Sequence, residues 1–226
     1  MLWMFPIIGR PNQETWKVKL NGNEYSLGSH GISRVLPWAI AEQSSKEIKL
    51  VQSYLGELVK NNRKGEKPDE LNFIPFNLIQ TIGIKESSLY VNLDVVNSSP
   101  EILKYDIVFH PASKIIEGKT RSQLMFDGKK IPLEEVLNTI LKDGTQYIQD
   151  TNVISYFNEK GYFSMKTDGF KHLMLWTPHK KAGMFCIEPI TNLPEENKNK
   201  YLDDYVCETL SPGGRAEYSI YLSFSD

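Results

Sequence analysis

The chain has 226 residues, of which 40% are hydrophobic and 24% charged, and its formal net charge is −2. This composition is typical of a globular protein with enough apolar material for a substantial core. The small net charge gives no sign of a strongly charged partner, so neither nucleic acid nor an acidic membrane surface is expected as a ligand. The length fits one domain, which we expect to span residues 1–226.

The N-terminal segment and the two cysteines indicate the compartment. The segment MLWMFPIIGR is apolar, but no basic residue precedes its apolar part, and a proline and a glycine interrupt it. It is therefore predicted neither as a signal peptide nor as a transmembrane segment. Cys186 and Cys207 lie in apolar surroundings and do not form a disulfide framework. We expect a cytoplasmic protein with reduced thiols.

Alternation of apolar and polar residues is the dominant pattern and predicts strands. The first such run covers residues 16–20, and Asn21-Gly22 then favours a tight hairpin because both residues tolerate positive φ. The same alternation returns at residues 89–95 and 218–224. Shorter apolar runs predict further strands at residues 46–54, 106–110, 172–176 and 183–188.

Helical signals are few. Residues 131–144, IPLEEVLNTILKDG, have a proline near the start, acidic residues in the first turn and a glycine after the end. These are boundary signals of a helix. The polar residues 193–205 fit either a helical turn or a loop. Strands along the whole chain with one clear helix predict an all-β architecture, such as a β-sandwich.

Four short segments carry polar residues that the alternation does not explain. They contain Arg10 in PIIGR, His30 and Arg34 in GSHGISR, His110 in VFHPASK, and Glu188 in CIEPITNLP. Taken singly, each residue also has an ordinary interpretation. A histidine or a carboxylate is common at a strand end or in a turn, and an arginine commonly forms a surface salt bridge.

The order of these segments resembles the aldose 1-epimerase (galactose mutarotase-like) family, especially its divergent bacterial members. Those members often read FPIIGR, HGFAR, HPAF and CIEPW in this order. Asn97 and the SPGG segment at residues 211–214 also fall where they have similar residues. The resemblance covers nearly the whole chain. It implies a large antiparallel β-sandwich, the galactose mutarotase-like supersandwich, with one or two short helices and a carbohydrate cleft on a concave sheet.

The resemblance also implies a reaction, the interconversion of the α and β anomers of an aldose, without a metal or an organic cofactor. The expected ligand is a monosaccharide or a sugar phosphate. An acid and a base on opposite sides of the C1–O5 unit would open and close the ring. By the family pattern, Glu188 is the base and His110 the acid. His30 and Arg10 would bind the sugar, and Arg34 would orient the loop of His30 or meet an anionic substituent such as a phosphate.

The chain also departs from the family pattern. Family members usually have several strands ahead of the FPIIGR segment, so we expect this chain to lack them and to cover the edge they leave by forming a homodimer. Ser113 and Ile190 stand where the family tends to have aromatic residues. Asp168 is considered for the acidic residue that holds a sugar hydroxyl in some members, although KTDG first indicates a turn. Trp176 is expected in the core, with stacking on the sugar as the alternative.

These departures keep other functions open. Without the two aromatic rings, the alternative is a carbohydrate-binding protein on the same fold with little or no turnover. A glycoside hydrolase is a third interpretation, but it would need a second carboxylate beside Glu188, and no motif supplies one.

Overall fold

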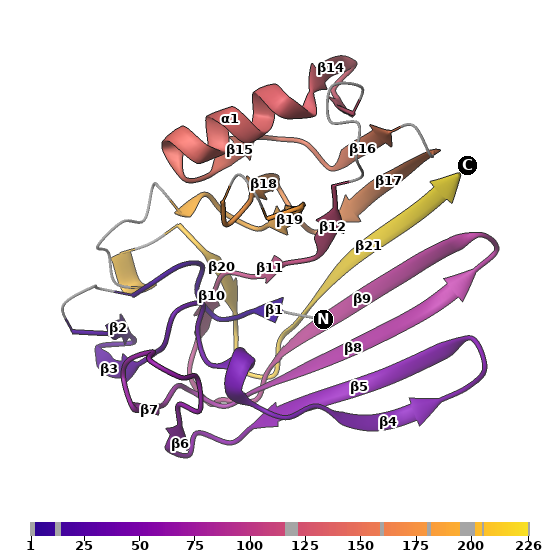
Figure 1. Ribbon diagram of the computed structural model, residues 1–226. Coiled ribbons are helices and arrows are strands. Elements are labelled where there is room, and N and C mark those ends of the chain that lie inside the picture. Colours follow the sequence, from indigo (N-terminus) through magenta and orange to yellow (C-terminus); the bar gives the residue numbers. More distant parts are fainter. Residues whose placement is uncertain are drawn as a thin grey trace.

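The computed structural model describes residues 3–11, 15–115, 122–158, 161–179, 182–194, 202–204 and 206–225. In these residues the chain forms two antiparallel sheets of unequal size, and strands of the smaller sheet lie over the larger one (Figure 1). The same described residues also form three two-stranded pairs and one α-helix. The expected all-β sandwich with one clear helix is confirmed.

The larger sheet has nine strands with alternating burial. Their order is β14 (Lys129–Pro132), β13 (Gln123–Phe126), β16 (Val153–Asn158), β17 (Gly161–Asp168), β21 (Arg215–Ser225), β9 (Ser88–Asn97), β8 (Phe76–Lys85), β5 (Glu47–Tyr54) and β4 (Ala39–Gln43). On β9, Val91, Leu93 and Val95 are fully buried and the residues between them are half-buried. The apolar residues of the alternating sequence pattern therefore form the inner face of this sheet.

The smaller sheet carries two of the four motif segments, those that contain His110 and Glu188. Its path is β1 (Trp3–Met4), β11 (Val108–Phe109), β19 (Met184–Ile190), β18 (His172–Trp176) and β15 (Gln146–Ile148), and β12 (Ala112–Lys114) also pairs with β19. The short pairs are β2 (Lys17–Leu20) with β3 (Asn23–Ser26), β6 (Val59–Lys60) with β7 (Glu70–Leu71), and β10 (Leu103–Tyr105) with β20 (Glu208–Leu210). Among the described residues, Ser33–Val35 and Leu202–Asp204 form 3-10 turns.

Strand alternation gives the smaller sheet two different faces. On the inner face, Ile187, Leu175 and Phe109 join the main core, which also contains residues of the larger sheet. On the outer face, Met174 and Ile190 belong to a separate small apolar cluster. Because side chains alternate along a strand, Met184, Cys186 and Glu188 share the outer face of β19 with Ile190. The outer face is thus where polar residues of the motifs appear.

The helix α1 (Leu133–Asp143) confirms the helix read from the sequence. It buries Leu133, Val136 and Ile140 and contacts β14, β15 and β18. Gly144 has φ +87 and donates its backbone N–H to the carbonyl of Ile140 at 2.7 Å, which ends the helix. Of the segment 193–205, residues 195–201 and 205 lie outside the described residues.

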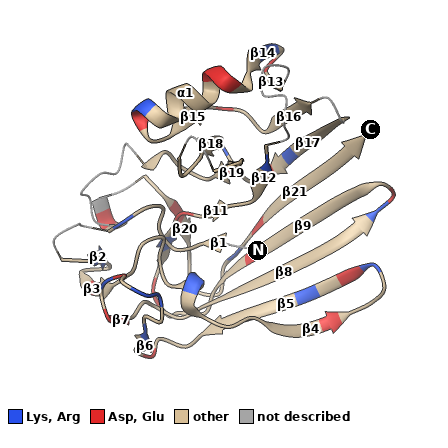
Figure 2. Ribbon diagram, viewed as in Figure 1, with Lys and Arg blue, Asp and Glu red and all other residues tan. Residues whose placement is uncertain are grey.

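Charged residues of both signs are spread over several elements (Figure 2). No helix in the described ranges has the length and apolar character to cross a membrane.

The loop that carries His30 is held against the N-terminal segment by a glycine contact. Gly31 has φ +81, and a Cβ on it would lie 2.0 Å from the carbonyl oxygen of Phe5. This close approach lets the N–H groups of Ile32 and Ser33 donate to the same oxygen, at 3.0 and 3.3 Å. Only glycine fits here, since both the backbone conformation and the space exclude a side chain.

Gly31→Ala is expected to destabilise the protein by about 3–5 kcal/mol, because it combines a positive φ with a clash against backbone. Chemical unfolding would measure the loss. The matched control is Gly22→Ala in the β2–β3 hairpin, where φ is +76 and a Cβ would meet nothing within 4 Å. Only the backbone cost of about 1 kcal/mol is expected there. Equal losses in the two variants would contradict the close contact with Phe5.

Candidate functional site

A cavity opens on the outer face of the smaller sheet, between that face and the loop of residues 28–34. The volume of the cavity is about 340 Å³. Four of the five site residues expected from the sequence line it: His30, Arg34, His110 and Glu188. Pockets of a few hundred cubic ångströms with a few converging polar groups are typical of small-molecule sites.

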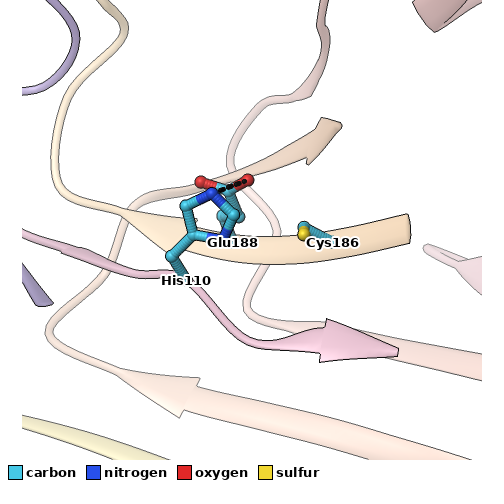
Figure 3. A group of neighbouring side chains, drawn as sticks. All are labelled: His110, Cys186 and Glu188. Carbon is cyan, nitrogen blue, oxygen red and sulfur yellow. Dashed lines mark ion pairs between the residues drawn. The ribbon is translucent and has the colours of Figure 1, made fainter. Parts of the chain in front are cut away.

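Strand register brings Glu188 and His110 together. Val108 pairs with Ile190 and Ala112 pairs with Cys186, so His110 lies opposite Glu188 across the two strands. The Nε2 atom of His110 is 3.4 Å from Oε1 of Glu188 (Figure 3). The two side chains thus contact each other in the free protein, whereas the family resemblance implies an acid and a base on opposite sides of the C1–O5 unit.

The Glu188 carboxyl group is buried without a hydrogen bond. Its side chain is 1% exposed, and neither oxygen has a hydrogen-bond partner among the described residues. The 3.4 Å contact with His110 is within ion-pair distance but is not a hydrogen bond. Transfer of a carboxylate from water to such a place is costly, and burial raises the pKa of Glu188 to about 8.

The pKa of His110 is shifted in the opposite direction to that of Glu188. Burial lowers the pKa of its imidazole, and the positive charge of Arg34 acts in the same direction. A glutamate that tends to keep its proton and a histidine that tends to stay neutral hold one proton between them near neutral pH. The pair therefore holds the single proton that is needed for one group to act as an acid while the other acts as a base.

His30 is a neutral hydrogen-bonding group. Its Nδ1 accepts the N–H of Gly9 at 3.1 Å, and its own backbone N–H donates to the Gly9 carbonyl at 2.5 Å. Burial, followed by the positive charge of Arg34, lowers the pKa of His30 to about 3. A neutral imidazole that accepts through Nδ1 carries its proton on Nε2. His30 thus has one N–H to donate.

Arg34 contributes a half-buried positive charge to the cavity wall. Its Nη1 donates to the carbonyl of Ser29 at 3.3 Å, and its buried Nε has no hydrogen-bond partner in the described part of the chain. No ion pair joins Arg34 to a carboxylate of the described residues. The salt bridge considered as its ordinary interpretation is therefore not seen, and the guanidinium keeps donors for another group.

Arg10 and Asp168 lie outside the lining of the cavity. Arg10 is exposed, and its guanidinium carbon is 5.8 Å from the ring centre of Trp16, a cation–π contact. Its sugar-binding role stays a prediction that this placement does not support. Asp168 is exposed at the end of β17 and accepts the N–H of Gly169 at 3.0 Å, as expected of a turn.

The cavity also has an aromatic wall that the sequence indicated only in part. Trp176, expected in the core, is half-buried and lines the cavity, with its ring 5.7 Å from that of His110. Its position favours the alternative of stacking on a ligand. Tyr147, from the edge strand β15, was not anticipated because three residues with little alternation give no strand signal. Ile190 is fully buried in the outer apolar cluster, and Ser113 does not line the cavity.

Comparison with known proteins identifies the fold. No protein-family model and no curated protein matches the sequence. Solved structures do match. A galactose mutarotase-like protein from Lactobacillus casei superposes with a TM-score of 0.80 at 18% identity, covering 99% of this chain and 84% of that one. A galactose mutarotase related enzyme from Lactobacillus acidophilus gives 0.77 at 19% identity, with 99% and 82% covered.

A less similar solved structure shows the same fold. An aldose epimerase homologue from C. elegans has a TM-score of 0.65 at 11% identity, with 99% of this chain and 81% of that chain covered. The chain therefore has the galactose mutarotase-like fold, and the fold implied by the motif resemblance is confirmed. At these identities the likeness shows the fold alone.

Proposed function

We propose that this protein interconverts the α and β anomers of an aldose by acid–base ring opening, with Glu188 as the base and His110 as the acid. The observation that carries the proposal is the buried Glu188 carboxyl group, which has no hydrogen-bond partner among the described residues and lies 3.4 Å from His110 in the cavity. A buried, proton-retaining carboxyl group in a cavity is a frequent property of acid–base sites.

The reaction needs one proton on the pair at every stage. In the active form, Glu188 is a carboxylate and His110 carries the proton. Glu188 removes the proton of the C1 hydroxyl, whose O–H electrons form the aldehyde C=O. The C1–O5 bond breaks, its electrons stay on O5, and His110 donates its proton there. After rotation about the C1–C2 bond, the reverse transfers close the ring on the other face of C1.

The contact between the two side chains is compatible with this chemistry. O1 and O5 are bonded to the same carbon, so neighbouring groups can reach both oxygens. The proton that Glu188 gains is balanced by the one that His110 loses, and the buried pair therefore stays neutral overall. Because charge separation in a site of low dielectric is costly, conservation of the pair's charge lowers the barrier.

The other residues of the cavity provide binding. The Nε2–H of His30 would donate to a ring oxygen or a neighbouring hydroxyl, and the Trp176 ring offers an apolar face for the sugar. Arg34, with its buried Nε unpartnered among the described residues, would bind an anionic substituent. A phosphorylated aldose is therefore a proposed substrate in addition to a free one, because guanidinium groups bind phosphate strongly.

NMR exchange between anomers tests the proposal. Catalysis is expected with glucose, galactose or a hexose phosphate, above the rate in buffer. If none of these sugars exchanges faster with the protein, the enzymatic function is wrong. Chemical-shift changes on sugar addition without faster exchange would instead support the carbohydrate-binding alternative.

The rate is also expected to depend on pH as a bell. Above a pH of about 8 the pair loses its proton, because burial raises the pKa of Glu188 to that value. Below the lowered pKa of His110 a second proton is added, and Glu188 can no longer act as a base. Measurement of kcat/KM from about pH 5 to about pH 10 with EDTA present, after subtraction of the buffer rate, checks this. A rate that keeps rising above pH 8 would contradict a shared proton.

A further inference from the structure

A third functional group lies beside the acid–base pair and takes no part in the chemistry proposed above. It is the thiol of Cys186, which is fully buried. A ring nitrogen of His110, the Sγ atom of Cys186 and an oxygen of Glu188 all lie within 4.8 Å of one another (Figure 3). Nitrogen, sulfur and oxygen donors converge on one small volume.

The strands hold these three groups in place. Cys186 and Glu188 are two residues apart on β19 and so point to the same face, while His110 lies opposite Glu188 in the register of β11 and β12. The β19 backbone lies inside the smaller sheet, with β18 on one side and β11 and β12 on the other. Cys186 and Glu188 lie on a paired strand, and His110 lies between β11 and β12, which both pair with β19, so the spacing of the three groups is held better than on a free loop.

The distance between the nitrogen and oxygen donors agrees with that of a zinc site, and the Cys186 Sγ lies within 4.8 Å of both. Zinc binds nitrogen and oxygen at about 2.0–2.2 Å and thiolate at about 2.3 Å in tetrahedral geometry, which separates the ligand atoms by about 3.3–3.6 Å. The distance between His110 Nε2 and Glu188 Oε1 is 3.4 Å, and it is not a hydrogen bond. Both Glu188 oxygens are buried and have no hydrogen-bond partner among the described residues, so the site holds an unsatisfied carboxyl group that a cation would satisfy.

We propose that a zinc ion binds to His110, Cys186 and Glu188 and thereby blocks anomer interconversion. The inhibitory part of this proposal rests on the proposed function, whereas the binding part does not. A thiolate, an imidazole and a carboxylate together favour zinc over magnesium or calcium, which prefer oxygen ligands alone. Three protein ligands leave a fourth position for water, as in open zinc sites.

Zinc binding and acid–base catalysis exclude each other at this site because they use the same atoms. A nitrogen lone pair of His110 that is bound to zinc cannot carry the proton meant for the ring oxygen. A Glu188 oxygen that is bound to zinc is a poor acceptor for the C1 hydroxyl proton. The fraction of protein with bound zinc and the fraction of activity lost should therefore depend on zinc concentration in the same way. Replacing Cys186 should weaken zinc binding and leave turnover without zinc unchanged.

Binding is tested on the 226-residue chain without sugar, by calorimetric titration with Zn²⁺ and by the absorption of the protein loaded with Co²⁺. One ion per chain is expected, and cobalt should show a sulfur-to-metal charge-transfer band. In Cys186→Ala and Cys186→Ser the band should disappear and the affinity for zinc should fall about 100-fold or more. The matched control is Cys207→Ala, since Cys207 is the second thiol and should leave both measurements unchanged.

The outcomes separate the two proposals. Absence of zinc binding in the wild-type protein, or unchanged affinity in both folded Cys186 variants, overturns the metal site and leaves the proposed epimerase activity untouched. If zinc binds as expected but the EDTA-treated wild type does not speed up anomer exchange, the site stands and the proposed function fails. If both hold, EDTA-treated Cys186→Ala should turn over sugar at the wild-type rate and resist zinc. Equal inhibition of Cys186→Ala and the wild type by zinc overturns the inhibitory role of this site.

Discussion

Glutamine in place of Glu188 is expected to lower the protein-dependent rate of anomer exchange by about 10²–10⁴-fold, the usual cost of losing a general base or acid. The amide has nearly the same shape as the carboxyl group but cannot accept the C1 hydroxyl proton. The fold should persist, because the substitution preserves the volume of a fully buried side chain. NMR exchange of the anomers at saturating sugar would measure the loss.

The control for this variant is Asp168→Asn. Asp168 was considered for the site from the sequence, but it is exposed at the end of β17 and does not line the cavity. The rate of anomer exchange with Asp168→Asn should stay within about twofold of the wild-type rate, since a surface substitution away from the site changes little. A Glu188→Gln variant as active as Asp168→Asn would remove Glu188 from the mechanism.

The parts of the site that the sequence predicted well are those fixed by strand parity. On β19, the position of Glu188 two residues from Cys186 sets a common face, and the structure keeps it. On β18, Leu173 and Leu175 are in the main core, so Trp176 must point the other way. Strand parity in the apolar run HLMLW places Trp176 on the face of His172, opposite Leu173 and Leu175, and this could have moved Trp176 from the expected core to the cavity wall.

The parts that the sequence did not predict depend on contacts between distant segments. The proximity of His110 and Glu188 follows from the pairing of Val108 with Ile190, and no local pattern encodes that register. The direction of the Arg10 side chain depends on where Trp16 packs. The short strand β15, which brings Tyr147 to the cavity, has no alternation of its own and is stabilised by its pairing with β18.

The proton of Glu188 should also make the free energy of unfolding depend on pH. The pKa of Glu188 is about 8 in the folded protein against an ordinary value of 4.5, and burial is the cause. The folded state therefore binds the proton more tightly than the unfolded state, and the free energy of unfolding falls as the pH rises from 4.5 to 8. At about 1.4 kcal/mol per pH unit across this window, the fall is at most about 5 kcal/mol.

Glu188→Gln should abolish this contribution, because the variant has no titratable group at the position. The buried amide lacks hydrogen-bond partners just as the carboxyl group does, but that cost is the same at every pH. The stability of the variant relative to the wild type is therefore expected to improve by several kcal/mol between about pH 5 and about pH 9. Urea unfolding at a series of pH values, with EDTA present, would show the two curves diverging.

The Asp168→Asn variant again gives the comparison, since an exposed carboxylate should leave the pH profile of stability parallel to that of the wild type. If the Glu188→Gln profile were also parallel, Glu188 would have to be ionised in the folded protein at neutral pH, with its charge balanced by a protonated His110. The pair would then still hold one proton, but as an ion pair. The basic limb of the rate profile would move to the higher pKa of that ion pair, so the stability and rate measurements together locate the proton.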